Sequence, residues 1–150
     1  FGLIYDVQVQ DDPAVRQLIL AGEMEPEAMR DQRENRLVPI EMSVLVVGYQ
    51  QGDKIMQGLP PQPPVSLDML VLCNDSNIRA FTNQLSYIRL VLNAPQVPAD
   101  ELLIANILRS ASARTGEARQ AFLIDAGREL ARLLSFDLVR LDSMLRRIRP

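Results

Sequence analysis

The chain has 150 residues and a mass of 16.9 kDa, a length that favours a single domain. Its 47% apolar and 23% charged residues, with a mean hydropathy near zero, are typical of a globular protein without a membrane span. The absence of histidine excludes Ser-His-Asp and Cys-His catalysis and His-ligated zinc. The sole cysteine, Cys73, excludes an internal disulfide and is expected to be a small buried hydrophobe in a reducing, cytoplasmic setting.

The first 36 residues predict a strand, a short helix and an exposed loop. Residues 2–10 alternate apolar and polar side chains, the pattern of a half-buried strand. Asp12 followed by Pro13 predicts the start of a short helix that ends near Gly22. Residues 23–36 carry dense charges of both signs and predict an exposed loop with one helical stretch.

Residues 38–72 predict further strands. The run 44–47 is too continuously apolar for a strand with one wet face, and residues 42–57 predict a hairpin that turns at 50–53. Four prolines in residues 58–64 place that stretch on the surface. Residues 67–72 form another apolar run of strand length. We expect the runs 44–47 and 67–72 to be buried and to dominate stability.

After Cys73 the apolar spacing becomes helical. Asp75 or Ser76 is predicted to cap a first turn, residues 87–92 form an apolar stripe, and a helix begins after Pro98 and runs to about residue 113. Residues 117–149 predict a long final helix that either kinks near residues 135–136 or packs on a partner. Its apolar positions recur close to every seven residues: Leu130, Leu134, Leu138, Leu141, Leu145 and Ile148.

These elements predict an α+β protein. Residues 1–73 are expected to form a small, mainly antiparallel β-barrel. Residues 74–150 are expected to form a C-terminal helical region that packs on the barrel or forms an oligomer interface.

No catalytic, cofactor-binding or metal-binding residues are predicted, and we expect a protein that is not an enzyme and needs no cofactor. The glycine-containing stretch at residues 48–55 has three residues between its glycines and no lysine directly after the second, so it fails as a phosphate-binding Walker A loop. The acidic pairs and triplets at residues 11–12 and 23–27 lack the calcium-loop pattern and are better explained as caps and solvated charge.

The basic residues are almost all arginines and suggest two candidate contact surfaces. The net charge of −3 divides unequally: residues 1–100 hold 7 basic and 13 acidic groups, and residues 101–150 hold 9 and 6. Arg30, Arg33 and Arg36 are candidate partner contacts, with pairing to nearby acids such as Glu34 as the alternative. The candidate anion or DNA contacts lie in the last helices, where arginines also suit a helix carboxyl end: Arg128, Arg132, Arg146, Arg147 and Arg149.

Five segments of residues 1–80 carry a resemblance to a known family: Gly2-Leu3-Ile4-Tyr5-Asp6-Val7, Asp11-Asp12-Pro13, residues 31–39, Val46-Val47-Gly48-Tyr49 and residues 58–64. They resemble bacterial proteins with the HAS-barrel, the small barrel that precedes the ATPase core in HerA-type DNA translocases and occurs in rotary ATP synthase subunits. The resemblance implies a non-catalytic barrel that helps an ATPase ring assemble. Here a helical tail stands where the ATPase core would follow.

Three functions follow as hypotheses. The first is an assembly or adaptor module of a HerA-type hexameric ATPase or its partner nuclease, in which the chain itself is expected to form a homo-oligomer. The second is DNA binding through arginines of the C-terminal helices. The third is a metal-dependent hydrolase or nuclease that uses carboxylates without histidine. No membrane partner is expected.

Overall fold

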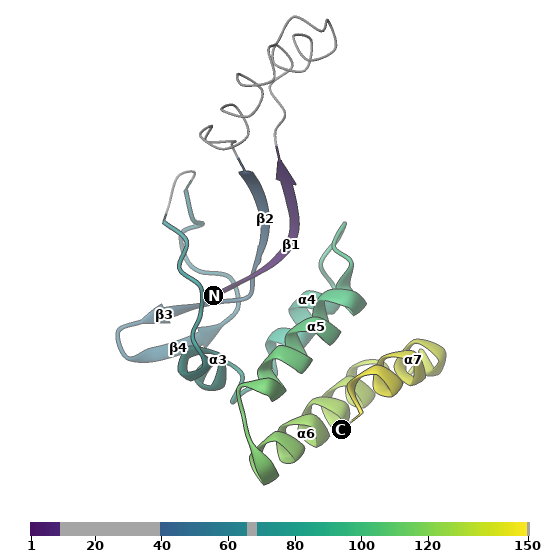
Figure 1. The fold of residues 1–150 in the computed structure, drawn as a ribbon. Helices are drawn as coiled ribbons and strands as arrows, with labels where there is room; N and C mark the ends of the chain where they lie inside the picture. Colours follow the sequence, from purple (N-terminus) through teal and green to yellow (C-terminus); the bar gives the residue numbers. More distant parts are fainter. Residues whose placement is uncertain (10–39, 66–68, 150) are drawn as a thin grey trace, which may run out of the picture. The chain divides into compact units, whose positions relative to one another are not determined.

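The computed structural model describes residues 1–9, 40–65 and 69–149, and it divides the chain into two units. One unit comprises Phe1–Tyr5 and Leu45–Pro150, and the other comprises Asp6–Val44. Strand β1 (Gly2–Val9) pairs with strand β2 (Ile40–Val46) in a two-stranded antiparallel sheet (Figure 1). The strand predicted at the start of the chain is therefore confirmed, whereas the helix and loop predicted for residues 12–36 lie outside the described residues.

Strands β3 (Gly48–Gln51) and β4 (Lys54–Gln57) form the second sheet, an antiparallel hairpin. Gln51 pairs with Lys54 across a two-residue turn in which Gly52 has a φ of 59°. Glycine adopts this left-handed conformation without steric cost, which is why tight hairpin turns favour it. The hairpin predicted from the turn residues at 50–53 is confirmed for residues 48–57.

The predicted β-barrel is wrong. The described residues contain two separate sheets of two strands each, and neither closes on itself. A closed barrel needs a continuous ladder around its circumference. The described part of the run at 67–72, which the sequence suggests as a further strand, forms no strand and pairs with neither sheet.

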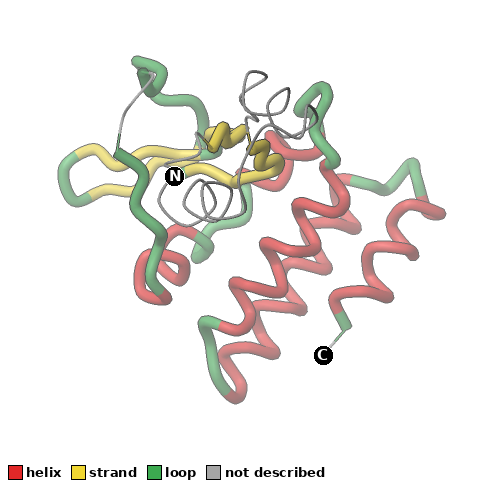
Figure 2. Tube along the Cα trace, turned by 45° about the horizontal axis from the view of Figure 1, so that its top comes forward, coloured by secondary structure: helices red, strands yellow, loops and turns green. Residues whose placement is uncertain are grey.

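Helices occupy the chain from residue 75 onward. They are α3 (Asp75–Phe81), α4 (Tyr87–Leu92), α5 (Ala99–Ser112), α6 (Gly116–Leu133) and α7 (Leu138–Ile148). Asn74, one residue earlier than expected, caps α3 by accepting a hydrogen bond from the backbone N–H of Asn77 at 2.9 Å. Helices α5, α6 and α7 pack against one another, as the three long red segments of Figure 2 show.

The long C-terminal helix predicted for residues 117–149 is broken between Leu133 and Leu138, where the sequence left a kink as one alternative. The break lets α7 fold back beside α6 and α5. Most of the seven-residue stripe thereby joins the core of this chain: Leu130, Leu134 and Ile148 are buried, Leu141 and Leu145 are half-buried, and Leu138 is exposed. The stripe is therefore not a free oligomer interface along its length.

The buried core lies among the helices. Among the described residues before α3, Val47, which joins β2 to β3, is the one hydrophobic residue that is fully part of this core. The predicted burial of residues 44–47 holds for Val47, while Val44, Leu45 and Val46 are half-buried. The ring of Phe81, at the end of α3, stacks on Phe1 with centroids 4.7 Å apart and lies 5.1 Å from Tyr87. This aromatic group joins the hairpin to the helices.

Hydrogen bonds from one side chain complete that junction. Gln57, at the end of β4, donates to the backbone carbonyls of Phe81 and Gln84, each at 2.8 Å. Its amide oxygen accepts from the backbone N–H of Tyr87 at 2.9 Å. A single glutamine thus satisfies three backbone groups in the turn between α3 and α4.

We predict that Gly48→Ala destabilises the fold. A Cβ atom at this position would lie 2.6 Å from the backbone oxygen of Met56 and 2.6 Å from Cε2 of Phe81. Overpacking of this kind costs about 1–3 kcal/mol of unfolding free energy, measurable by chemical denaturation.

Gly127→Ala in α6 is the matched control. Its Cβ would meet only Leu145, at 3.4 Å, and alanine favours a helix interior over glycine by about 0.5–1 kcal/mol. We expect unchanged or increased stability for this variant. Equal stability of Gly48→Ala and wild type would show that the Phe81 junction is not closely packed.

Candidate functional site

The described residues hold no cluster of metal-ligating groups. No set of three or more His, Cys, Asp or Glu side chains in them could hold a metal ion. The Tyr87 hydroxyl donates to Asn106 Oδ1 at 2.5 Å, and burial raises the pKa of Tyr87, so the phenol keeps its proton. This pair stabilises the contact between α4 and α5 and is not a general base.

The arginines predicted to contact DNA are mostly paired with carboxylates of the same chain. Within α6 Arg128 pairs with Asp125 at 3.2 Å and Arg132 with Glu129 at 2.6 Å. Within α7 Arg146 pairs with Asp142 at 2.8 Å. Because each positive charge has a neighbouring negative charge, these faces lack the unbalanced basic surface that attracts phosphates.

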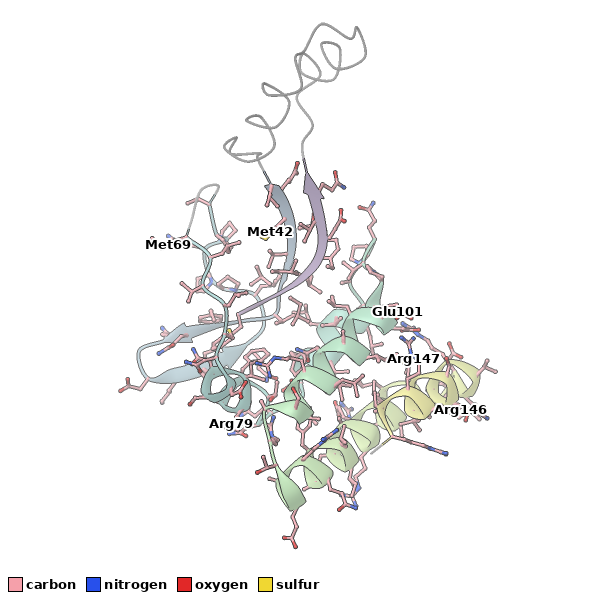
Figure 3. The ribbon with its side chains drawn as sticks, viewed as in Figure 1. Met42, Met69, Arg79, Glu101, Arg146 and Arg147 are labelled. Atoms are coloured by element: carbon pink, nitrogen blue, oxygen red, sulfur yellow. The ribbon has the colours of Figure 1, made fainter. Side chains whose placement is uncertain are left out.

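Two further arginines of α7 form ion pairs with carboxylates in the first turn of α5. Arg147 binds Glu101 through two hydrogen bonds of 2.5 Å, and the pair lies between the two helices in Figure 3. Arg140 binds Asp100 in the same forked manner, with its Nη2 2.6 Å from Oδ1. Planar arginine groups suit this geometry. Arg147, a predicted DNA contact, is therefore part of the helix packing.

The remaining predicted contact residues are not brought together. Arg149 follows the end of α7 and has no ion pair in the part of the chain that the structure describes. Arg30, Arg33 and Arg36 lie outside the described residues.

Sequence reasoning missed Arg79 and Arg114, which bind backbone carbonyls. Arg114 donates to the carbonyl of Ser110 at 2.8 Å and lies 4.2 Å from the ring centre of Phe122. Arg79 donates to the carbonyl of Ala113 at 2.7 Å. Burial lowers the pKa of Arg114, and the nearby Arg79 adds to that effect. Both arginines satisfy carbonyls at the end of α5, a role that arginine near a helix carboxyl end often takes.

The most unusual surface is residues 69–73, here called the apolar segment. Met69 is 90% exposed, Val71 82% and Leu72 87%, while Leu70 is 59% exposed and Cys73 is exposed as well. The predictions that this run is buried and that Cys73 is a buried hydrophobe are therefore wrong. Five consecutive side chains are thus exposed directly before α3.

The backbone of the apolar segment is also unpaired. Within residues 1–9, 40–65 and 69–149, none of the N–H or C=O groups of residues 69–73 takes part in a hydrogen bond. A strand-forming sequence thus precedes α3 and pairs with no strand among the described residues, and Met69 is labelled at its start in Figure 3.

A second exposed apolar group lies at the turn between α6 and α7. Phe136, Leu138 and Val139 are all more than two-thirds exposed. Part of the backbone here is paired: the N–H of Asp137 donates to the carbonyl of Leu134 at 2.9 Å, and the N–H of Arg140 to the Asp137 carboxylate at 3.1 Å.

Comparison with known proteins adds no relative. No protein-family model, curated protein or solved structure matches the chain. Among the described residues, none of the helices has the length and apolar character needed to cross a bilayer.

The Arg147–Glu101 pair predicts how stability depends on pH. The hydrogen bonds from Arg147 lower the pKa of Glu101, so the folded state favours the ionised carboxylate. A lowered folded-state pKa stabilises the fold at pH values above the ordinary carboxyl pKa of 4.5, and this stabilisation is lost as the pH falls through the folded-state pKa. Glu101→Gln should therefore be less stable than wild type at pH 7, and the difference should shrink below about pH 4.

Chemical denaturation at pH 7 and below about pH 4 measures the difference in stability between Glu101→Gln and wild type. The same comparison in an Arg147→Gln background provides the control. Without the guanidinium, Glu101→Gln should show little pH-dependent effect. A pH dependence that persists in that background would assign the effect to a group other than this ion pair.

Proposed function

We propose that this chain is a non-catalytic assembly module that joins a HerA-type hexameric ATPase through the apolar segment. The observation that carries the proposal is the high exposure of an uncharged, strand-forming run that directly precedes a well-packed set of helices. Large exposed apolar patches on a folded protein usually mark sites of interaction with a partner.

The energetic argument favours a protein partner. Burying a large aliphatic side chain contributes roughly 1.5–3 kcal/mol, and the segment offers four such side chains. Part of that gain offsets the entropy lost when two proteins associate. Nucleic acid would not supply it, because the segment carries no charge to neutralise phosphates.

The choice of partner rests on the resemblance of residues 1–80 to proteins that act beside an ATPase ring. The absence of a barrel in the described residues means that the resemblance supports a partner class and not a shared architecture. We place the complex in the cytoplasm, where an exposed single thiol such as Cys73 stays reduced.

We predict that Val71→Asp weakens binding to a purified HerA-type ATPase of the same organism by about tenfold or more, because the complex would bury an unpaired charge. Isothermal titration calorimetry measures the affinity. Since Val71 is 82% exposed, the variant should unfold at the same temperature as wild type.

Val139→Asp is the matched control. Val139 is 85% exposed and lies in the first turn of α7, where an added carboxylate is well tolerated. We expect wild-type affinity for this variant. Equal affinities of wild type and Val71→Asp, or no binding of wild type at all, would contradict the proposed function.

A further inference from the structure

We infer that α7 is a releasable arm, which detaches from α5 and α6 as a unit while those two helices stay folded. Two forked ion pairs to the first turn of α5, here called the clasp, control how often the arm opens. The clasp consists of Arg140 with Asp100 and Arg147 with Glu101 (Figure 3). Because opening needs no partner protein, it is independent of the proposed function.

The first step concerns the polar contacts of α7. Among the described residues, every hydrogen bond that joins α7 to another helix belongs to the clasp. The remaining polar contacts of α7 are local: Arg146 pairs with Asp142, and Asp137 caps the first turn. The two carboxylates of the clasp are neighbours in the sequence, so the polar attachment of α7 is confined to one place.

The second step concerns the link before α7. Leu134 is buried, and every side chain from Ser135 to Val139 is exposed. A connection whose side chains lie outside the core can change its backbone angles without breaking core contacts. The turn at residues 135–137 can therefore serve as the hinge of the arm.

The third step concerns the apolar contacts that hold the arm closed. Met144 and Ile148 are buried, whereas Leu141 and Leu145 are only partly buried. Leu145 lies beside Gly127 of α6, where an added Cβ would be 3.4 Å from the Cδ2 atom of the leucine. Elements with few buried apolar side chains are the ones that open locally. Opening exposes the two buried side chains of α7 and the surfaces of α5 and α6 that they cover.

Helices α5 and α6 have contacts that do not involve α7. Asn106 of α5 accepts a hydrogen bond from the Tyr87 hydroxyl of α4 at 2.5 Å. Arg109 of α5 pairs with Asp75 of α3 at 2.6 Å. Helix α6 adds four buried side chains to the core: Phe122, Leu123, Ala126 and Leu130. These residues hold α5 and α6 in place when α7 leaves.

The clasp makes the opening of the arm sensitive to salt. Its four side chains are between 33% and 65% exposed, so ions from the solution reach them. The Debye length falls from about 10 Å at 0.1 M salt to about 3 Å at 1 M, and exposed charges are screened accordingly. Each exposed pair is weak alone, but both pairs oppose the same opening. A higher salt concentration should therefore favour the open arm.

The experiment is hydrogen exchange of the full chain at pH 7, measured by mass spectrometry on peptides from α5, α6 and α7. The exchange rate of a peptide reports how often its backbone hydrogen bonds open. In wild type, α7 should exchange faster than the buried parts of α5 and α6. Raising sodium chloride from about 0.1 M to about 1 M should accelerate exchange in α7 alone, by about threefold or more.

Two double variants remove the clasp from opposite sides. Asp100→Asn with Glu101→Gln changes α5. Arg140→Gln with Arg147→Gln changes α7 and keeps the acidic first turn of α5, which itself favours that helix. Each double variant should accelerate exchange in α7 by about threefold or more, leave the buried amides of α5 and α6 unchanged and remove most of the salt effect.

Asp125→Asn with Glu129→Gln is the matched control, because it neutralises two carboxylates that pair with arginines within α6 and leaves the clasp intact. Its ratio of α7 exchange to α5 exchange should equal that of wild type. Equal acceleration of α5, α6 and α7 in the clasp variants would overturn the releasable arm, because the helices would then open together. Exchange in α7 that neither salt nor either clasp variant changes would overturn control by the clasp.

Discussion

The packing of Phe81 against Gly48 is the contact on which the rest of the main unit depends. The absence of a side chain at Gly48 lets the ring approach the hairpin backbone, where an added Cβ would lie 2.6 Å from Cε2 of Phe81. Phe1 and Tyr87 pack against the same ring, and Gln57 ties the backbone of the neighbouring turn to β4. Through these contacts a short hairpin, which alone is only marginally stable, becomes part of a larger core.

This junction also explains why the apolar segment remains outside. The helices bury their apolar faces against one another, and Val47 with Phe81 closes the core on the side of the hairpin. The core is therefore completed without residues 69–73, whose side chains and backbone groups keep no partner within the described residues. A packed helical core next to the exposed apolar segment is suited to assembly with another protein. The proposed function depends on this division.

The parts of the fold that local rules control could be predicted from the sequence. The Gly52 turn fixes the hairpin, and the proline before α5 and the helical spacing after residue 98 fix that helix to within a residue or two. The barrel could not be predicted correctly, because pairing between distant strands depends on which edges meet and not on strand propensity alone. The apolar run at residues 69–72 is compatible with a buried strand or with an exposed segment, and its local sequence does not determine which of the two forms.

The candidate site followed a similar division. The spacing of Arg128 and Arg132 on one helix face suggested a basic surface, but Asp125 and Glu129, three residues earlier in each case, neutralise it. The pair between Arg147 and Glu101 joins residues 46 positions apart, so only the fold brings it together. The roles of Arg79 and Arg114 likewise depend on the meeting of α3 with the end of α5.

Hydrogen exchange of the backbone amides in residues 69–73, measured by mass spectrometry with and without the HerA-type ATPase, tests the central claim most directly. The account predicts fast exchange in the free chain, because these amides have no hydrogen-bond partner among the described residues. In the complex, these amides should exchange more slowly, because the bound partner would cover the segment. Slow exchange in the free chain, or unchanged fast exchange when the ATPase is bound, would contradict it.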